Sequence, residues 1–270
     1  MNSLLLWLEA TRPKTLIISV MPILIGTSFA FHQGAFSLLT CLMTLLTALC
    51  IQIGANFAND YYDCLKGADT PSRKGPRRMT QTGLISLSQM KLATFLTFSC
   101  VALLSIYLSA RGGPIFTLLT TLSIACGILY TGGPKPLAYL GLGECFVFLF
   151  FGPIATAATA YLQTLTFSRE ILFLGITPGL LASAVLIINN LRDIKEDQKA
   201  HKKTLATRFG KRFTQYEYTI FVLLGCLLPL VFGLWLPIFA LIPALIPLKT
   251  IWRYTHDSDL NVALVQTGQI

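Results

Sequence analysis

Two clusters of carboxylate and amide side chains in this 270-residue sequence are the groups best suited to chemistry. One lies within residues 56–63 and the other within residues 189–197, and in each an Asn precedes an Asp by four residues. This spacing places the two side chains on one face of a helix. Carboxylates gathered this closely repel one another unless a cation lies among them, and oxygen ligands suit Mg²⁺. We therefore predict a magnesium site whose ligands are Asp60, Asp63, Asp193 and Asp197.

A diphosphate is the natural third partner of such a site, because Mg²⁺ prefers a few carboxylates together with phosphate oxygens and water. Basic side chains accompany each cluster and can neutralise charge on that substrate. The residues of the two clusters that we predict to bind it are Asn56, Asn59, Lys66, Arg73, Asn189, Arg192 and Lys202. Solvated loop charges would explain a single acid of this kind, but here the pattern occurs twice.

The two clusters are also related to each other in register. Asn56 and Asp60 map onto Asn189 and Asp193 with one offset of 133 residues. This offset matches four of the membrane spans described next, so the two halves of the chain are predicted to be parallel pseudo-repeats. A binding site between such repeats is the expected arrangement.

The elements that position these clusters must be membrane helices. Hydrophobic residues make up 54% of the chain and charged residues only 12%, which is more apolar surface than a soluble domain of this length can bury. The apolar runs have no period-2 alternation, so they are predicted to be helices of an all-α, polytopic transmembrane bundle. Eight spans are expected, at Thr15–Phe31, Phe36–Phe57, Gln89–Leu108, Pro114–Tyr130, Gly143–Tyr161, Ile171–Ile188, Thr214–Leu234 and Trp235–Tyr254.

The positive charges predict the orientation of these spans. With the N-terminus in the cytoplasm, 19 of the 21 Lys and Arg residues fall on the cytoplasmic side, and only Arg111 and Arg169 lie outside. The net charge of +9 is thus explained by membrane topology, and we expect no nucleic-acid partner. Two long polar loops, containing residues 56–88 and 189–213, are predicted to face the cytoplasm and to carry the chemistry.

Four ordered segments of the sequence resemble the UbiA superfamily of membrane prenyltransferases, and specifically its 1,4-dihydroxy-2-naphthoate prenyltransferase branch. They are residues 12–16 (RPKTL), residues 59–85 (from NDYYD to TGLI), residues 130–144 (from YTGGPKPLAY to GE) and residues 189–206 (from NNLRDIKED to KKTLA). The resemblance covers nearly the whole chain, which is therefore predicted to be one transmembrane prenyltransferase domain, residues 1–270. It also adds Asp69 to the predicted substrate-binding residues.

The resemblance implies a reaction in which polyprenyl diphosphate ionises at its allylic C–O bond. The ring carbon of 1,4-dihydroxy-2-naphthoate that bears the carboxylate then attacks, and CO₂ is lost to give demethylmenaquinol. Mg²⁺ is the implied cofactor, and the implied location is the cell inner membrane, in contact with the lipid bilayer. We expect Tyr130 to face the allylic cation. Basic residues at cytoplasmic span ends, Arg12, Lys14 and Lys135, are candidates to bind the acceptor carboxylate.

Two other interpretations remain open from the sequence. A transporter or channel would also contain acids and pseudo-repeats, but here the acids lie at one membrane face, with no relay of charges across the spans. Within the enzyme family, 4-hydroxybenzoate or homogentisate is the alternative acceptor.

The family has nine spans, and we expect the ninth to be missing after residue 260. The segment Val262–Ile270 reaches roughly 14 Å as a helix, too short to cross a bilayer, so we expect the C-terminus to be cytoplasmic.

Overall fold

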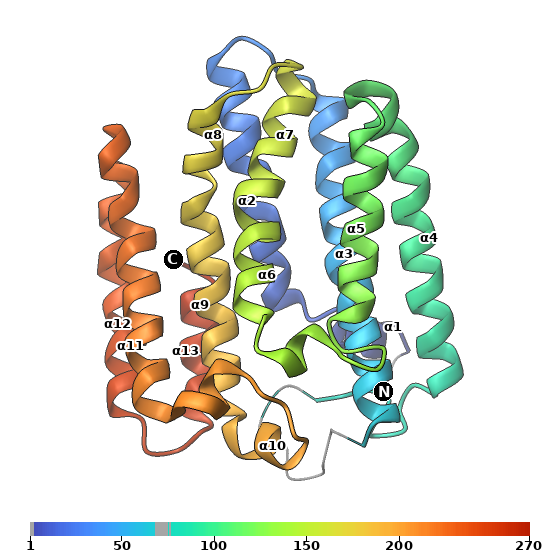
Figure 1. Ribbon diagram of the computed structural model, residues 1–270, viewed down its shortest axis with the longest axis vertical. Helices are drawn as coiled ribbons and strands as arrows, with labels where there is room; N and C mark the ends of the chain where they lie inside the picture. Colours follow the sequence, from blue (N-terminus) through green and yellow to red (C-terminus); the bar gives the residue numbers. More distant parts are fainter. Residues whose placement is uncertain (1–2, 68–74, 76) are drawn as a thin grey trace.

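The computed structural model describes residues 3–67, 75 and 77–270, and the described part of the chain is helical (Figure 1). Short 3₁₀ or π turns, labelled η, separate some of the helices. In chain order the elements are α1 (Ser3–Ala10), α2 (Pro13–His32), α3 (Leu38–Leu65), α4 (Leu87–Gly112), α5 (Ile115–Leu129), η1 (Leu137–Leu140), α6 (Gly143–Leu149), η2 (Phe150–Ile154), α7 (Ala155–Thr164), α8 (Arg169–Leu174), α9 (Ile176–Arg192), α10 (Ile194–Lys199), α11 (Leu205–Leu227), η3 (Leu228–Phe232), η4 (Leu236–Ala240), α12 (Leu241–Arg253) and α13 (Asp259–Thr267).

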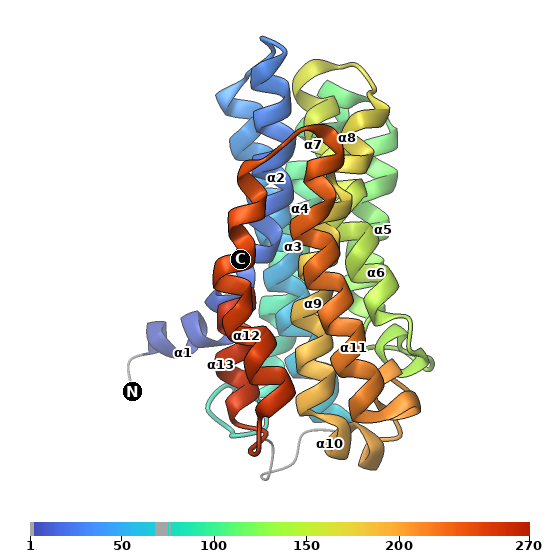
Figure 2. The same ribbon diagram turned by 90° about the vertical axis from the view of Figure 1, so that its left-hand side faces the viewer.

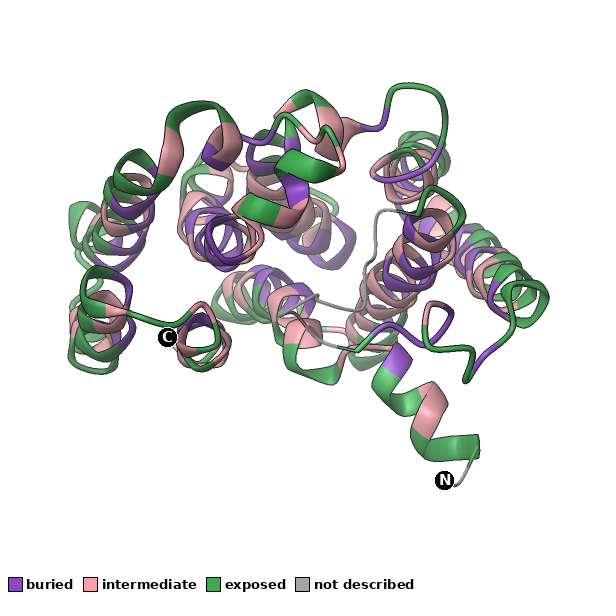
Figure 3. Cartoon of the chain, turned by 90° about the horizontal axis from the view of Figure 1, so that it is seen from below, coloured by how far each residue is buried: buried purple, intermediate pink, exposed green. Residues whose placement is uncertain are grey.

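The predicted all-α membrane bundle is confirmed. Within the described residues, seven helical segments are long and apolar enough to cross a membrane, where elements joined without a break, such as α6, η2 and α7, count as one segment. The remaining apolar helix, α5, is shorter, with 15 residues. Together they correspond to the eight predicted spans. They run side by side along one direction in Figures 1 and 2. Seen from the end that carries α10, buried residues lie on the faces that the helices turn toward one another (Figure 3).

Side chains on the outer surface are apolar, as expected for contact with lipid. On α4, for example, Phe95 is 67% exposed and Leu103 is 69% exposed. In water such a surface would favour aggregation, whereas in hydrocarbon it carries no penalty.

The two predicted polar loops differ from the structure, because helices extend well into both. Helix α3 continues through Leu65, eight residues past the predicted end of the second span, so the first acidic cluster lies on a helix. In the second region, α9 continues through Arg192 and is followed by α10 and then by α11 from Leu205. The polar residues are helical there because their side chains are held by neighbouring elements, as described below.

The fifth span is broken where it crosses α9. Gly152 has non-helical dihedral angles (φ −122°, ψ −111°) and separates α6 from α7. A Cβ at Gly152 would lie 2.6 Å from the Gly175 carbonyl oxygen and 2.7 Å from the Gly179 Cα. Three glycines therefore let two backbones touch, which is a common device for packing helices in membranes.

The two ends of the chain lie differently from the spans. Helix α1 runs across their direction and projects from the side of the bundle (Figure 2). Helix α13 begins at the α10 end and packs against α9 and α12. The C-terminus lies beside the middle of the bundle in both views. The reason is burial of Leu260, Ala263 and Leu264 in the same apolar cluster as α9.

We predict that Gly152→Ala destabilises the protein, because the added methyl group meets backbone atoms that cannot move aside. Overpacking of this kind costs about 1–3 kcal/mol. A matched control is Gly127→Ala, whose Cβ meets only side chains, Phe98 at 3.2 Å and Ala55 at 3.6 Å. Thermal unfolding in detergent is the measurement, and equal melting temperatures for the two variants would contradict the glycine contact described here.

Candidate active site

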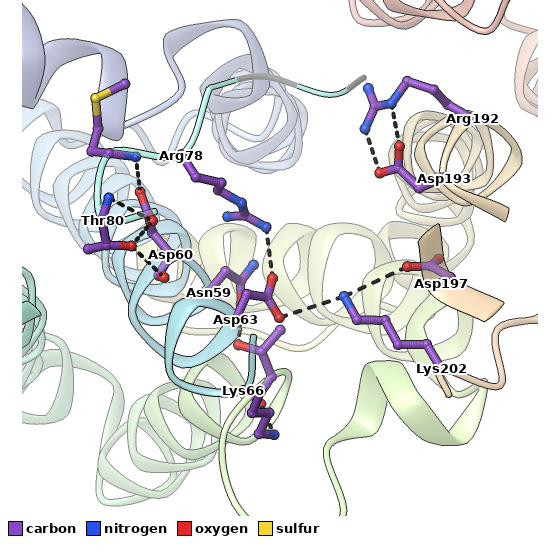
Figure 4. Close-up of polar contacts among 12 residues, drawn as sticks. Asn59, Asp60, Asp63, Lys66, Arg78, Thr80, Arg192, Asp193, Asp197 and Lys202 are labelled. Carbon is purple, nitrogen blue, oxygen red and sulfur yellow. Dashed lines mark hydrogen bonds and ion pairs between the residues drawn. The ribbon is translucent and has the colours of Figure 1, made fainter. Parts of the chain in front are cut away.

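The two acidic clusters meet at one end of the bundle, as the pseudo-repeat predicts. Lys202 Nζ lies 3.6 Å from Asp63 Oδ1, at the end of α3, and 3.7 Å from Asp197 Oδ1, on α10. Figure 4 shows Lys202 between these two carboxylates. Residues 134 positions apart in the sequence thus share one cation.

The face of α3 turned toward this region carries Asn56, Asn59 and Asp63, at intervals of three and four residues. Asn56 donates a hydrogen bond to the Thr11 carbonyl at 2.9 Å, and Asn59 accepts one from the Thr131 hydroxyl at 2.8 Å. Asp63 is 1% exposed and accepts a hydrogen bond from Arg78 Nη2 at 2.8 Å. All three side chains are thereby fixed in direction.

Asp60 lies three residues before Asp63 on α3, but its carboxylate is bonded to a different part of the chain. Its carboxylate accepts hydrogen bonds from the Met79 amide at 3.0 Å, the Thr80 amide at 3.3 Å and the Thr80 hydroxyl. In Figure 4 it points away from Asp193 and Asp197. The structure therefore does not bring Asp60 to the other three predicted metal ligands, and its visible role is to hold residues 79–80.

The second cluster is held by Arg192, the last residue of α9. Arg192 is 2% exposed, and its Nε and Nη2 donate to the two carboxylate oxygens of Asp193 at 2.7 and 2.8 Å. Its Nη1 donates to Asn261 Oδ1 on α13 at 2.8 Å. Arg192 thus orients Asp193, rather than standing exposed to a phosphate as the sequence suggested.

Lys66 contacts the loop after α5. Its Nζ donates to the carbonyl oxygens of Thr131, at 2.5 Å, and Gly133, at 3.3 Å. Partial burial lowers the pKa of Lys66, whereas Asp63 raises it and Lys202 lowers it further. The ring of Tyr139 lies 5.0 Å from Lys66 Nζ and 5.2 Å from Lys202 Nζ, so both ammonium groups face one aromatic ring.

A cavity of about 300 Å³ opens inside the bundle beside the two clusters. Predicted site residues on its wall are Arg12, Asn56, Asn59, Tyr130 and Asn189. Beyond them the wall is mostly apolar, with Ile23, Leu162, Phe146, Phe150 and Val185 among its residues. The cavity thus combines polar residues from the acidic clusters with an apolar interior.

Two of the predicted basic residues are not placed at this cavity by the structure. Lys14 and Lys135 are exposed and do not line it. Asp69 and Arg73 lie outside the described residues.

Sequence reasoning missed several contacts that shape the site. Arg78 was not singled out among the basic side chains near the first cluster, yet it is 5% exposed and paired with Asp63. Buried Glu144 accepts a hydrogen bond at 2.7 Å from Asn190, next to Asn189 on α9. Asn261 lies 69 residues from Arg192, so no local spacing indicates their contact. Arg78, Glu144 and Asn190 lie in segments that carry the family resemblance, which offered a signal, whereas Asn261 does not.

The donor atoms fit a divalent cation only in part. Asp63 Oδ1 is buried and accepts no hydrogen bond among the described residues, and every candidate ligand is an oxygen atom, as Mg²⁺ prefers. However, no three His, Cys, Asp or Glu side chains of the described chain converge closely enough to hold a metal by themselves. The predicted four-Asp cage is therefore not formed by the protein alone, because basic side chains lie between the carboxylates.

Comparison with known proteins gives a consistent result. The profile of the UbiA prenyltransferase family matches residues 19–263. The chain is 42% identical over 211 residues to the 1,4-dihydroxy-2-naphthoate octaprenyltransferase of Escherichia coli strain K12. The aligned region covers 76% of this chain and 68% of that protein.

Two solved structures share the fold. The apo UbiA homolog of Aeropyrum pernix K1 matches with a TM-score of 0.70 at 14% identity, over 95% of this chain and 94% of that chain. A UbiA homolog of Archaeoglobus fulgidus bound to GPP and Mg²⁺ matches with a TM-score of 0.67 at 16% identity, over 98% of each chain.

We predict that Asp60→Ala exposes the segment after it to solvent exchange, because the Met79 and Thr80 amides lose their acceptor. Hydrogen exchange followed by mass spectrometry should show faster exchange in a peptide covering residues 77–86. Asp193→Asn is the control, because Asp193 makes its pair with Arg192 on the other cluster. Unchanged exchange in Asp60→Ala would show that this carboxylate does not hold the segment.

Proposed function

Because the chain belongs to the UbiA prenyltransferase family, we propose that it is a membrane enzyme that transfers a polyprenyl chain from polyprenyl diphosphate to 1,4-dihydroxy-2-naphthoate. CO₂ is lost and demethylmenaquinol is formed, a step of menaquinone biosynthesis. The observation that carries the proposal is the meeting of Asp63 and Asp197 on one cation, Lys202, beside a cavity with an apolar interior. This arrangement suits an amphiphile with an anionic head and a hydrocarbon tail.

The cavity is large enough for one end of such a substrate but not for the whole of it. About 300 Å³ is at the lower end for ligand pockets. The allylic end of the substrate and the acceptor ring would occupy the cavity, and the rest of the tail would extend sideways into lipid. Apolar walls such as Phe146 and Phe150 exclude water from the allylic carbon during the reaction.

Asn59, Asp63, Asp193 and Asp197 are the residues that would hold magnesium, together with diphosphate oxygens. When bound, the metal supplies positive charge that stabilises the departing diphosphate. The incomplete donor set fits this role, because Mg²⁺ is commonly bound by one or two carboxylates plus substrate phosphates. Asp60 is left out of this set, since its carboxylate is already bonded to residues 79–80.

Lys202 and Arg78 would stabilise the negative charge that develops on the leaving group. As the allylic C–O bond breaks, its electron pair leaves with the diphosphate, and the negative charge near Asp63 grows. Both bases lie against Asp63 in the structure, Lys202 at 3.6 Å and Arg78 at 2.8 Å. From these positions both bases are close to where the leaving diphosphate gains negative charge, and they would stabilise it.

Arg12 is our choice for the acceptor carboxylate. Of the three basic candidates at span ends, it alone lines the cavity. It stands at the start of α2 with φ 55°, an uncommon conformation for a non-glycine residue. Tyr130, also on the cavity wall, would face the allylic cation. The new C–C bond forms at the carbon that bears the carboxylate, and departure of CO₂ returns its electron pair to the ring.

The proposed location is the cell inner membrane, with the N-terminus and both acidic clusters on the cytoplasmic side. The distribution of Lys and Arg supports this orientation, since 19 of 21 fall on the side of the clusters.

We predict that membranes containing the protein prenylate 1,4-dihydroxy-2-naphthoate when supplied with Mg²⁺ and a polyprenyl diphosphate. Under the same conditions 4-hydroxybenzoate should not react, because the similarity to the naphthoate enzyme is strong along the chain. Product analysis by mass spectrometry decides between them. Equal or faster transfer to 4-hydroxybenzoate would show that the acceptor has been assigned wrongly.

Metal dependence gives a second prediction. Chelation with EDTA should stop transfer, Mg²⁺ should restore it, and Zn²⁺ should do so poorly, because the proposed ligands are all oxygen atoms. Because the protein donors are incomplete, Mn²⁺ should bind tightly only when a prenyl diphosphate is present. Electron paramagnetic resonance of the purified protein measures this binding, and tight Mn²⁺ binding without diphosphate would contradict the shared site.

A further inference from the structure

The contact between Arg192 and Asn261 joins the second acidic cluster to a distant part of the chain. Arg192 ends α9, and Asn261 lies in the first turn of α13. Nη1 of the arginine donates to Oδ1 of the asparagine at 2.8 Å, and the other side of the guanidinium holds both oxygens of Asp193. Arg192, Asp193 and Asn261 therefore form one continuous chain of hydrogen bonds.

The guanidinium is planar, so fixing one of its edges fixes the direction of the others. Arg192 is 2% exposed, and water cannot readily replace a lost protein partner at such a position. If Asn261 offered no acceptor, Nη1 would have to rotate to find one, and the pair with Asp193 would rotate with it. The direction of the Asp193 carboxylate thus depends on Asn261.

The paired carboxylate remains able to bind a further cation. Two carboxylate oxygens offer about four lone-pair directions, and the pair with Arg192 uses two of them. The side chain of Asp193 is 16% exposed, compared with 1% for that of Arg192, so its carboxylate is the more accessible member of the pair. Arg192 leaves Asp193 oriented rather than blocked.

Helix α13, which carries Asn261, is fixed in place by packing and by a buried hydrogen bond. Its side chains Leu260, Ala263 and Leu264 are buried in one cluster with residues of α9. Farther along the helix, Thr267 and Tyr218 of α11 share a buried hydrogen bond of 2.7 Å between their hydroxyl groups. Asn261 is therefore held from both its own helix and the neighbouring one.

We propose that Asn261 is a positioning residue for the second acidic cluster, and that through Arg192 it sets the direction in which Asp193 meets the metal and diphosphate. This inference rests on the proposed function. It makes α13 part of the active site, although Asn261 itself touches no substrate.

The test uses three variants of the full chain. Asn261→Leu removes the acceptor at similar size, and Asn261→Asp keeps an oxygen for Nη1. Thr267→Val is the matched control, because it removes a different polar contact of α13, with Tyr218, and leaves Arg192 untouched. A merely structural role of α13 would make Asn261→Leu and Thr267→Val behave alike.

Mn²⁺ binding to the purified proteins, measured by electron paramagnetic resonance with an unreactive prenyl thiodiphosphate present, is the readout. We expect about tenfold weaker binding in Asn261→Leu, as for other residues that orient metal ligands. Asn261→Asp and Thr267→Val should bind as the wild type does, and transfer by Asn261→Leu should recover at saturating Mg²⁺. Wild-type affinity in Asn261→Leu would overturn the proposal.

Asp193→Asn, measured in parallel, distinguishes the positioning role of Asn261 from the assignment of Asp193 to the metal site. Weakened binding in Asp193→Asn with unchanged binding in Asn261→Leu refutes only the positioning role. Unchanged binding in Asp193→Asn refutes the assignment of Asp193 to the metal site, and with it the role of Asn261.

Discussion

Repulsion between buried carboxylates is the constraint on which this end of the bundle depends. Three of the acids are paired with bases: Arg78 at Asp63, Arg192 at Asp193 and Lys202 at Asp197. Such compensation is required because an isolated charge at low dielectric is costly. A metal ion with a diphosphate carries both signs of charge and can exchange places with these internal pairs. The charges of these internal pairs therefore match in sign those of a bound metal ion and diphosphate.

The bundle serves this constraint by holding two helix ends at a fixed separation. α3 supplies Asn59 and Asp63, and α9 supplies Arg192 just before Asp193. Close backbone contact at Gly152 and Gly179 keeps the broken fifth span against α9. The break also leaves room for the cavity, whose wall includes Phe150 and other residues of the same span. The same helix contacts thus hold the bundle together and shape the cavity.

Much of this architecture followed from the sequence because its signals are local. Apolar run length predicted the spans, and a repeated four-residue spacing predicted that the clusters would meet. The orientation of Asp60 could not be predicted in this way, because its partners Met79 and Thr80 lie across a polar segment. The burial of α13 was missed for a related reason: a length argument excluded crossing but said nothing of packing against α9. Local spacing fixes which face a side chain occupies, whereas tertiary contacts decide what that face meets.

The central claim is that the two acidic clusters hold one diphosphate together, and a double-mutant cycle tests it most directly. Asp63→Asn, Asp197→Asn and the double variant are compared for diphosphate-dependent Mn²⁺ binding. Residues that share one site should be strongly coupled, with the double variant little worse than either single variant and a coupling free energy of about 0.5–3 kcal/mol. Losses that simply add would show that the clusters act independently, and would contradict the account.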